Sequence, residues 1–89
     1  EPTADLAIAL ATASAMAHKA LPAKMVVLGE VGLAGEIRRI PNTVRRLQEA
    51  QRLGFTTAII PNGEKVTVPG ITVHYVRDIT DAISTAFNA

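Results

Sequence analysis

The 89-residue sequence has no cysteine, no tryptophan and only three aromatic residues, Phe55, Tyr75 and Phe87. Without cysteine there is no disulfide framework, no thiolate nucleophile and no cysteine ligand for a zinc site. The most apolar stretch, residues 6–17, is interrupted by two hydroxyl residues, so no apolar run reaches the ~18 residues that a membrane helix needs. We therefore expect no membrane partner.

The sequence also has little net charge, +1, while 48% of its residues are hydrophobic. This balance excludes an intrinsically disordered chain. The length allows one small domain at most. Fifteen of the residues are alanine, and eight of these fall between Ala4 and Ala20. The core must therefore be built from alanine, valine, isoleucine and leucine, with a closely packed first segment.

Periodicity and turn residues predict an α/β (α+β) fold with the order α-β-β-α-β-β-α. Residues 1–20 are apolar on nearly every face, which predicts a buried helix with Thr3 as its cap. Residues 25–29 form a continuous apolar run, which predicts a central strand. We expect this strand to form a hairpin with a second strand at residues 35–40.

The second half of the chain continues the alternation. A helix is expected at residues 43–53, capped by Asn42, with Val44, Leu47 and Ala50 on its buried face and Gly54 ending it in a left-handed conformation. Strands are expected at residues 55–60 and 71–76, with a short extended piece at residues 65–68. A last helix follows Asp78. Its expected buried stripe is Ile79, Ala82, Ile83, Ala86 and Phe87.

Basic residues are unevenly placed along the chain. Five of the nine lie between positions 38 and 52, and all are arginine: Arg38, Arg39, Arg45, Arg46 and Arg52. Arginine pairs with phosphate through a planar fork, so this cluster is a candidate nucleic-acid surface formed by Arg38, Arg39, Arg45 and Arg52. The alternative is a solvated helix face with a weak Arg45–Glu49 pair. The small net charge favours this alternative, and the residues alone do not decide between the two.

Other residue types show no catalytic or metal-binding pattern. His18 and His74 are far apart and have no carboxylate or cysteine at ligand spacing. Glycines at 29, 32 and 35 are not followed by the Lys-Ser or Lys-Thr of a phosphate-binding loop. No serine–histidine–aspartate arrangement is visible. We therefore expect no metal and no bound cofactor in this segment.

Several strings in the sequence nevertheless match a known pattern in order and spacing. The most specific is Gly-Glu-Val-Gly-Leu-Ala-Gly-Glu-Ile-Arg at residues 29–38. The others lie at residues 1–10, 41–42, 46–50, 54–55 and 58–61. Their order and spacing match across nearly the whole chain. They resemble the C-terminal Lon-protease-like domain of the RadA (Sms) family of bacterial recombination proteins, which implies a Lon-protease-like (ribosomal-protein-S5-domain-2-like) fold.

The resemblance can be tested against the chemistry of Lon-type peptidases, which use a serine in Gly-Pro-Ser-Ala-Gly and an activating lysine in the next helix. Thr3 occupies the serine position here, and 43 positions later the lysine position is filled by Arg46. A desolvated lysine can take a hydroxyl proton, but a guanidinium keeps its proton at neutral pH. We therefore expect no peptidase activity. Arg46 is expected instead to pair with Asp5 or Glu1.

The resemblance also implies the setting of this segment. RadA-type proteins are DNA-dependent ATPases that promote branch migration in homologous recombination and DNA repair in the bacterial cytoplasm. They act as hexameric rings beside RecA-type recombinases, on single-stranded or branched DNA. Their ATP, magnesium and zinc sites belong to a RecA-like core and a four-cysteine motif. This sequence contains neither.

The chain begins at Glu1 where a helix is expected to start, which suggests a piece of a longer protein. In the Lon-like fold, strands before this helix complete the sheet. We therefore expect residues 1–89 to be the C-terminal part of such a domain, with a face covered by another chain or another segment. Three functions stay open: a non-catalytic DNA-binding scaffold, a degenerate Lon-family peptidase, and a pure oligomerisation module.

Overall fold

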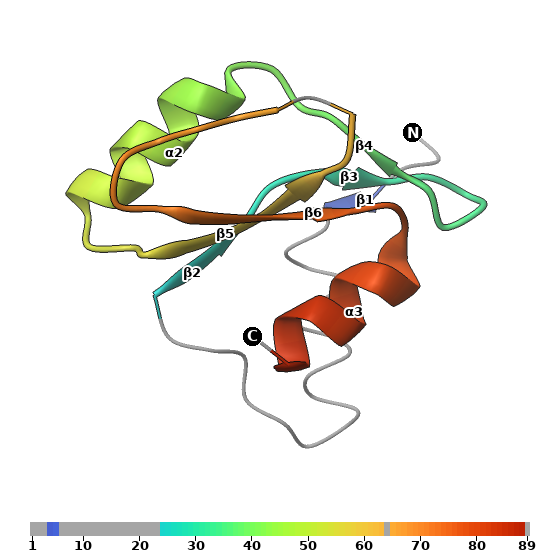
Figure 1. The fold of residues 1–89 in the computed structure, drawn as a ribbon. Helices are drawn as coiled ribbons and strands as arrows, with labels where there is room; N and C mark the ends of the chain where they lie inside the picture. The colour runs from blue at the N-terminus through green and yellow to red at the C-terminus, as the bar shows by residue number, and fades with distance from the viewer. Residues whose placement is uncertain (1–3, 6–23, 64, 89) are drawn as a thin grey trace.

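A computed structural model describes residues 4–5, 24–63 and 65–88 of the chain. Its elements, in chain order, are β1 (Ala4–Asp5), β2 (Met25–Val27), β3 (Glu30–Val31), β4 (Ile37–Arg38), α2 (Thr43–Arg52), β5 (Thr57–Pro61), β6 (Thr72–Val76) and α3 (Ile79–Asn88). Figure 1 shows α2 and α3 on opposite faces of a sheet. The expected α/β class is confirmed.

The main sheet has the order β2-β5-β6, and both neighbouring pairs are parallel. The chain leaves β2, passes through β3, β4 and α2, and returns as β5, which makes a β-α-β unit. Two parallel neighbouring strands need a long crossover connection, which a helix usually provides. Here α2 is that helix, and the crossover places it on one face of the sheet.

The core has two halves, one on each face of β5. Side chains on a strand alternate between faces, so Ala58 and Ile60 point towards α2 while Ile59 points towards α3. The half beneath α2 contains Leu47, Ala58, Ile60, Val66 and Val68. The half beneath α3 contains Ile59, Val76, Ala82 and Ala86. All of these side chains are almost fully buried.

A second, antiparallel sheet has the order β1-β3-β4 and aligns Asp5 with Glu30. The helix expected at residues 1–20 is wrong at Ala4–Asp5, which is a strand. Pairing with β3 gives these residues backbone hydrogen bonds between strands, and this outweighs the local capping signal. The rest of that expected helix, with Thr3 and His18, lies outside the described residues.

The hairpin expected between residues 25–29 and 35–40 is also wrong. β2 pairs in parallel with β5, and the hairpin is formed by β3 and β4. Within the described sheet β5, not β2, is the central strand. A run of residues that is apolar on both faces indicates a strand between two layers, but it does not indicate which strand lies beside it.

α2 has the expected range to within one residue, but one side chain expected on its buried face is exposed. Leu47 is fully buried and Ala50 nearly so, whereas Val44 is 43% exposed. Asn42 stands at the N-cap in a left-handed conformation (φ 62°) and its side chain makes no capping hydrogen bond. Gly54 follows the helix with φ +97°, as expected.

The segment at residues 65–68 packs against the sheet without forming a strand. Val66 and Val68 are buried beneath α2. The Tyr75 hydroxyl accepts a hydrogen bond from the Val66 N–H (2.8 Å) and donates one to the Val66 carbonyl (3.0 Å). The phenol of β6 thus replaces the ladder that a paired strand would have provided.

The start of α3 confirms the expected cap. The Asp78 Oδ1 accepts a hydrogen bond from the Asp81 N–H at 2.8 Å, and the Asp81 Oδ2 accepts one from the Arg77 N–H at 3.0 Å. The first bond satisfies a donor that a helix start leaves without a partner, and the second fixes the chain just before the helix. Ala82 and Ala86 are buried on the expected face.

Candidate functional site

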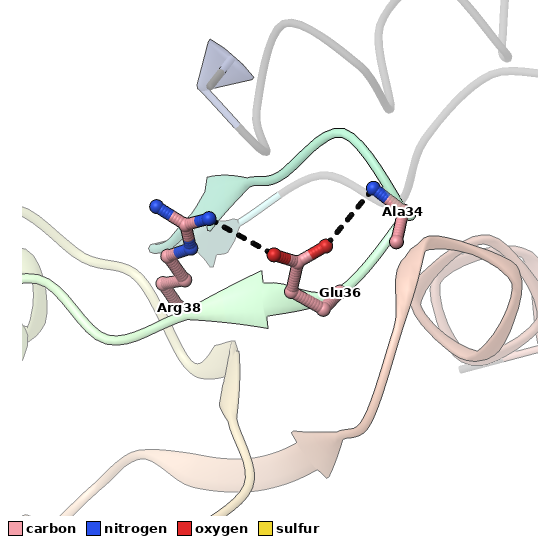
Figure 2. A network of polar contacts seen from close by, with 3 residues as sticks. All are labelled: Ala34, Glu36 and Arg38. Carbon is pink, nitrogen blue, oxygen red and sulfur yellow. Dashed lines mark hydrogen bonds and ion pairs between the residues drawn. The ribbon is translucent and has the colours of Figure 1, made fainter. Parts of the chain in front are cut away.

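The turn between β3 and β4 carries the most specific string of the sequence. Figure 2 shows the Glu36 carboxylate at its centre: Oε1 accepts a hydrogen bond from the Ala34 N–H (3.1 Å), and Oε2 accepts one from Arg38 Nη2 (3.0 Å). The hydrogen bond from Arg38, together with the backbone donors, holds the pKa of Glu36 below its ordinary value. The Glu36 carboxylate, which lies within the turn, therefore holds the turn in its conformation.

Two glycines of this string stand where the turn disfavours a side chain. A Cβ on Gly32 would lie 2.2 Å from Glu36 Oε2, closer than any real contact. Gly35 has φ +83°, and its carbonyl accepts a hydrogen bond from the Ile79 N–H (2.9 Å) at the start of α3. The turn is thus held by Glu36 and by α3, while Leu33 at its tip is 84% exposed.

The arginines of α2 gather on the exposed side of that helix, opposite Leu47 and Ala50. Asn42, Arg45, Arg46, Glu49 and Arg52 line an open hollow of about 430 Å³. Arg39 lies next to this hollow, because it lines a neighbouring depression that shares Asn42. We call Arg45, Arg46 and Arg52 the α2 arginine surface. The structure brings these three together and places Arg38 apart from them, on the hairpin.

The arginines differ in how far their charge is already neutralised. Arg38 pairs with Glu36, and Arg52 pairs with Glu49. The Arg45–Glu49 pair expected from the sequence is therefore wrong, because Glu49 turns to the arginine one helical turn later. Arg45 has no ion-pair partner among the described side chains. It is the arginine of the expected DNA set most available to an outside phosphate.

Arg46 has a position of its own at the start of α2. Its Nε donates a hydrogen bond to the Pro41 carbonyl (3.0 Å). The side chain also lines a smaller hollow of about 260 Å³ at the C-terminal end of β2, together with Glu30. The expected pairing with Glu1 or Asp5 involves side chains outside the described residues. Thr3, the other half of the Lon comparison, lies outside them as well.

The described residues offer little to a metal. No group of three histidine, cysteine, aspartate or glutamate side chains gathers closely enough among residues 4–5, 24–63 and 65–88 to hold an ion. Within the same part of the chain, no helix is long and apolar enough to cross a membrane.

Sequence reasoning missed the tie between Glu36 and Arg38. A signal for it was present, because residues two apart on a strand share a face. It also missed the hydroxyl of Tyr75, whose partner Val66 is a backbone group without any sequence signature. The exposed leucines, Leu33 and Leu53, were missed for the same kind of reason: apolar residues are expected in the core until the fold places them outside.

Comparison with known proteins matches most of the chain to one family model and nearly all of it to DNA repair proteins. A family model described as subunit ChlI of Mg-chelatase matches residues 2–64. DNA repair protein RadA of Mycolicibacterium smegmatis is 49% identical over 85 residues, which are 96% of this chain and 18% of that protein.

Two further RadA proteins match with similar coverage. That of Escherichia coli is 44% identical over 86 residues, 94% of this chain and 19% of that protein. That of Aquifex aeolicus is 42% identical over 87 residues, 98% of this chain and 20% of that protein. The chain therefore spans about a fifth of the length of these relatives.

Proposed function

Since the chain belongs to the family described as subunit ChlI of Mg-chelatase and is related to RadA over nearly its whole length, we propose that it is a DNA-contacting scaffold of a RadA-type protein. Residues 1–89 would form the C-terminal part of a Lon-protease-like domain. Its task is to bind and position DNA without cleaving a peptide.

The observation that carries this proposal is the α2 arginine surface. The three guanidinium groups outnumber the single carboxylate of Glu49 on this exposed helix face and raise the local positive potential, although the whole chain carries a net charge of only +1. Arg45 is free to form a forked contact with a phosphate. Arg39 extends the surface past Asn42. Binding releases counterions from the DNA and depends steeply on salt.

Arg38 and Arg52 contribute less in this arrangement. Each already has a carboxylate partner at the surface, and a phosphate must compete with that partner. Exposed ion pairs of this kind are worth little, so the competition is possible. We therefore rank Arg45 first among the expected DNA contacts, with Arg38 and Arg52 as secondary contacts.

We propose that the parent protein's activity belongs mainly to the parts of its relatives that this chain does not span. We propose that the parent is a DNA-dependent ATPase that promotes branch migration on single-stranded or branched DNA during recombination and repair. It would use ATP with magnesium, carry zinc in a separate motif, assemble as a homo-oligomeric ring and act with a RecA-type recombinase in the bacterial cytoplasm. The present segment would supply one tier of that ring.

The test is a salt titration of DNA binding by fluorescence anisotropy. Replacing Arg45→Ala should weaken binding and reduce the slope of log K against log salt by about one. Arg77→Ala is the matched control, since it removes the same charge from an arginine paired with Asp81 outside the surface. If the two substitutions weaken DNA binding equally, net charge alone explains the binding and a defined binding surface is contradicted.

A second candidate, an oligomerisation module without a DNA role, predicts a different result. The Arg45→Ala change would then lower the oligomer mass in light scattering and leave the salt slope of DNA binding unchanged. A degenerate peptidase predicts cleavage that depends on Thr3. The presence of Arg46 at the lysine position opposes it, because a guanidinium does not accept the hydroxyl proton.

A further inference from the structure

The turn that follows β5 contains the only asparagine–glycine pair of the sequence, Asn62 and Gly63. Both residues are exposed. Gly63 has φ +122°, and a Cβ built on it would meet nothing within 4 Å. Because glycine has no side chain, nothing of its own shields the backbone nitrogen of Gly63 from an attack on a neighbouring group.

The polar groups of this turn are held on one side only. The Asn62 N–H donates a hydrogen bond to the Val76 carbonyl (2.8 Å), which ties the end of β5 to the end of β6. Neither the Asn62 side-chain amide nor the Gly63 N–H makes a hydrogen bond within the part of the chain that the structure describes. The amide carbon of Asn62 and the nitrogen of Gly63 are therefore not restrained by hydrogen bonds of their own, and rotation about the bonds of Asn62 can bring them together.

We propose that Asn62 is a site of spontaneous deamidation, with water as the co-reactant. The Gly63 nitrogen, once it has lost its proton to hydroxide, attacks Cγ of Asn62. The new C–N bond closes a five-membered succinimide ring, and the side-chain nitrogen leaves as ammonia. Water then opens the ring. Cleavage of the bond between the Gly63 nitrogen and Cγ leaves an aspartate, and cleavage of the bond between that nitrogen and the backbone carbonyl carbon leaves an isoaspartate.

The other two asparagines of the chain, Asn42 and Asn88, are in settings that oppose this reaction. Asn42 is followed by Thr43, whose β-branched side chain crowds the nitrogen that would attack. The Asn88 Nδ2 donates a hydrogen bond to the Ser84 carbonyl (2.8 Å) in α3, which holds the amide away from the next backbone nitrogen. The structure thus singles out Asn62 among three side chains of the same chemistry.

The reaction changes both charge and chain length at this turn. Either product places a carboxylate in the open hollow of about 380 Å³ that Asn62 shares with Lys65 and Tyr75, and it cancels the net charge of +1. The isoaspartate also adds a methylene to the main chain just before residues 65–68. Since the Tyr75 hydroxyl holds Val66 by two hydrogen bonds, we expect the Val66 amide to exchange faster in the isoaspartate product.

The test compares the three asparagines within one molecule. The folded chain is incubated at mildly alkaline pH, digested, and its peptides are followed by mass spectrometry, because deamidation adds about one dalton. We expect the peptide with Asn62 to gain mass severalfold faster than those with Asn42 and Asn88. The rate should rise with pH, since the attacking nitrogen must lose its proton. Equal rates at the three asparagines, or a rate that does not rise with pH, would overturn the proposal.

Two variants test the attacking group. Gly63→Ala adds a methyl group beside the attacking nitrogen and should slow the gain at Asn62 severalfold. Gly70→Ala is the matched control, because it replaces another glycine of positive φ (+85°) in the same loop and should leave that rate unchanged. Circular dichroism checks that both variants keep the fold. Equal rates in the two variants would contradict the proposal.

Asn62→Gln keeps the glycine and therefore decides the question if Gly63→Ala fails to fold. Its longer side chain cannot close the five-membered ring, so the mass gain of this peptide should disappear. A gain that continued at the original rate would show that another residue of the peptide reacts, and it would overturn the assignment to Asn62.

Discussion

Removing the hydroxyl of Tyr75 is the most direct test of how residues 65–68 are held against the sheet. The hydroxyl makes two hydrogen bonds to the backbone of Val66, which is only 5% exposed. Tyr75→Phe keeps the ring and removes both bonds. Each such bond contributes a net ~0.5–1.5 kcal/mol, so we expect the free energy of unfolding to fall by about 1–3 kcal/mol. For a domain of this size, each kcal/mol lowers the melting temperature by about 4–8 °C.

The loss is measured by urea unfolding, followed by far-ultraviolet circular dichroism because the chain has no other tyrosine to report by fluorescence. Thr72→Val on the same strand is the matched control. It also removes a hydroxyl, but from an exposed side chain, and should change stability by less than ~0.5 kcal/mol. Amide exchange of Val66 gives a second, local measurement. Its protection should fall in Tyr75→Phe more than that of β5.

The reasoning is refuted if Tyr75→Phe and Thr72→Val have equal effects and Val66 exchange stays unchanged. That result would mean that water satisfies the Val66 backbone as well as the phenol does. The segment at residues 65–68 would then be held by the burial of its two valines alone.

Three further predictions use the same unfolding assay. Leu47→Ala should cost about 2–5 kcal/mol because the side chain is fully buried, whereas Val44→Ala, 43% exposed, should cost less than ~1 kcal/mol; similar losses would contradict the burial pattern. Gly54→Ala should cost about 1 kcal/mol or more because φ is +97°, and a stabilised variant would argue against that conformation. The hydrogen bond from Arg38 lowers the pKa of Glu36 in the folded state, so its stabilisation is present above the ordinary value of 4.5 and is lost as pH falls through the folded pKa. Glu36→Gln should therefore reduce the acid sensitivity of the unfolding midpoint, and an unchanged pH profile would count against the tie.

The elements that the sequence predicted well are those whose signals are local. α2 has a helical apolar spacing and is followed by Gly54, and α3 begins at a cap formed by Asp78. Both helices appear within a residue or two of the expected bounds. The arginine cluster was visible for a similar reason, because positions three, four or seven apart on one helix, such as Arg45 and Arg52, lie on one face.

The errors trace to pairing partners that lie far away in the sequence. Residues 25–29 were correctly predicted to be extended, yet they pair with β5 rather than with the nearby β4. Ala4–Asp5 follows a capping signal but adds to β3 as a strand. In both cases a contact with a distant segment supplies the backbone hydrogen bonds, and periodicity contains no information about such contacts.

Composition and local spacing were enough to establish the α/β class, α2 and α3, the concentration of arginine near α2 and the exclusion of thiol chemistry. Those properties depend on composition or on neighbours within one or two turns of a helix. The folded chain was needed to show that Glu49 pairs with Arg52 and leaves Arg45 without an ion pair among the described side chains, because that choice depends on side-chain geometry. It also decided that Leu33 and Leu53 lie outside the core, because burial is a property of how layers pack and not of the residue itself.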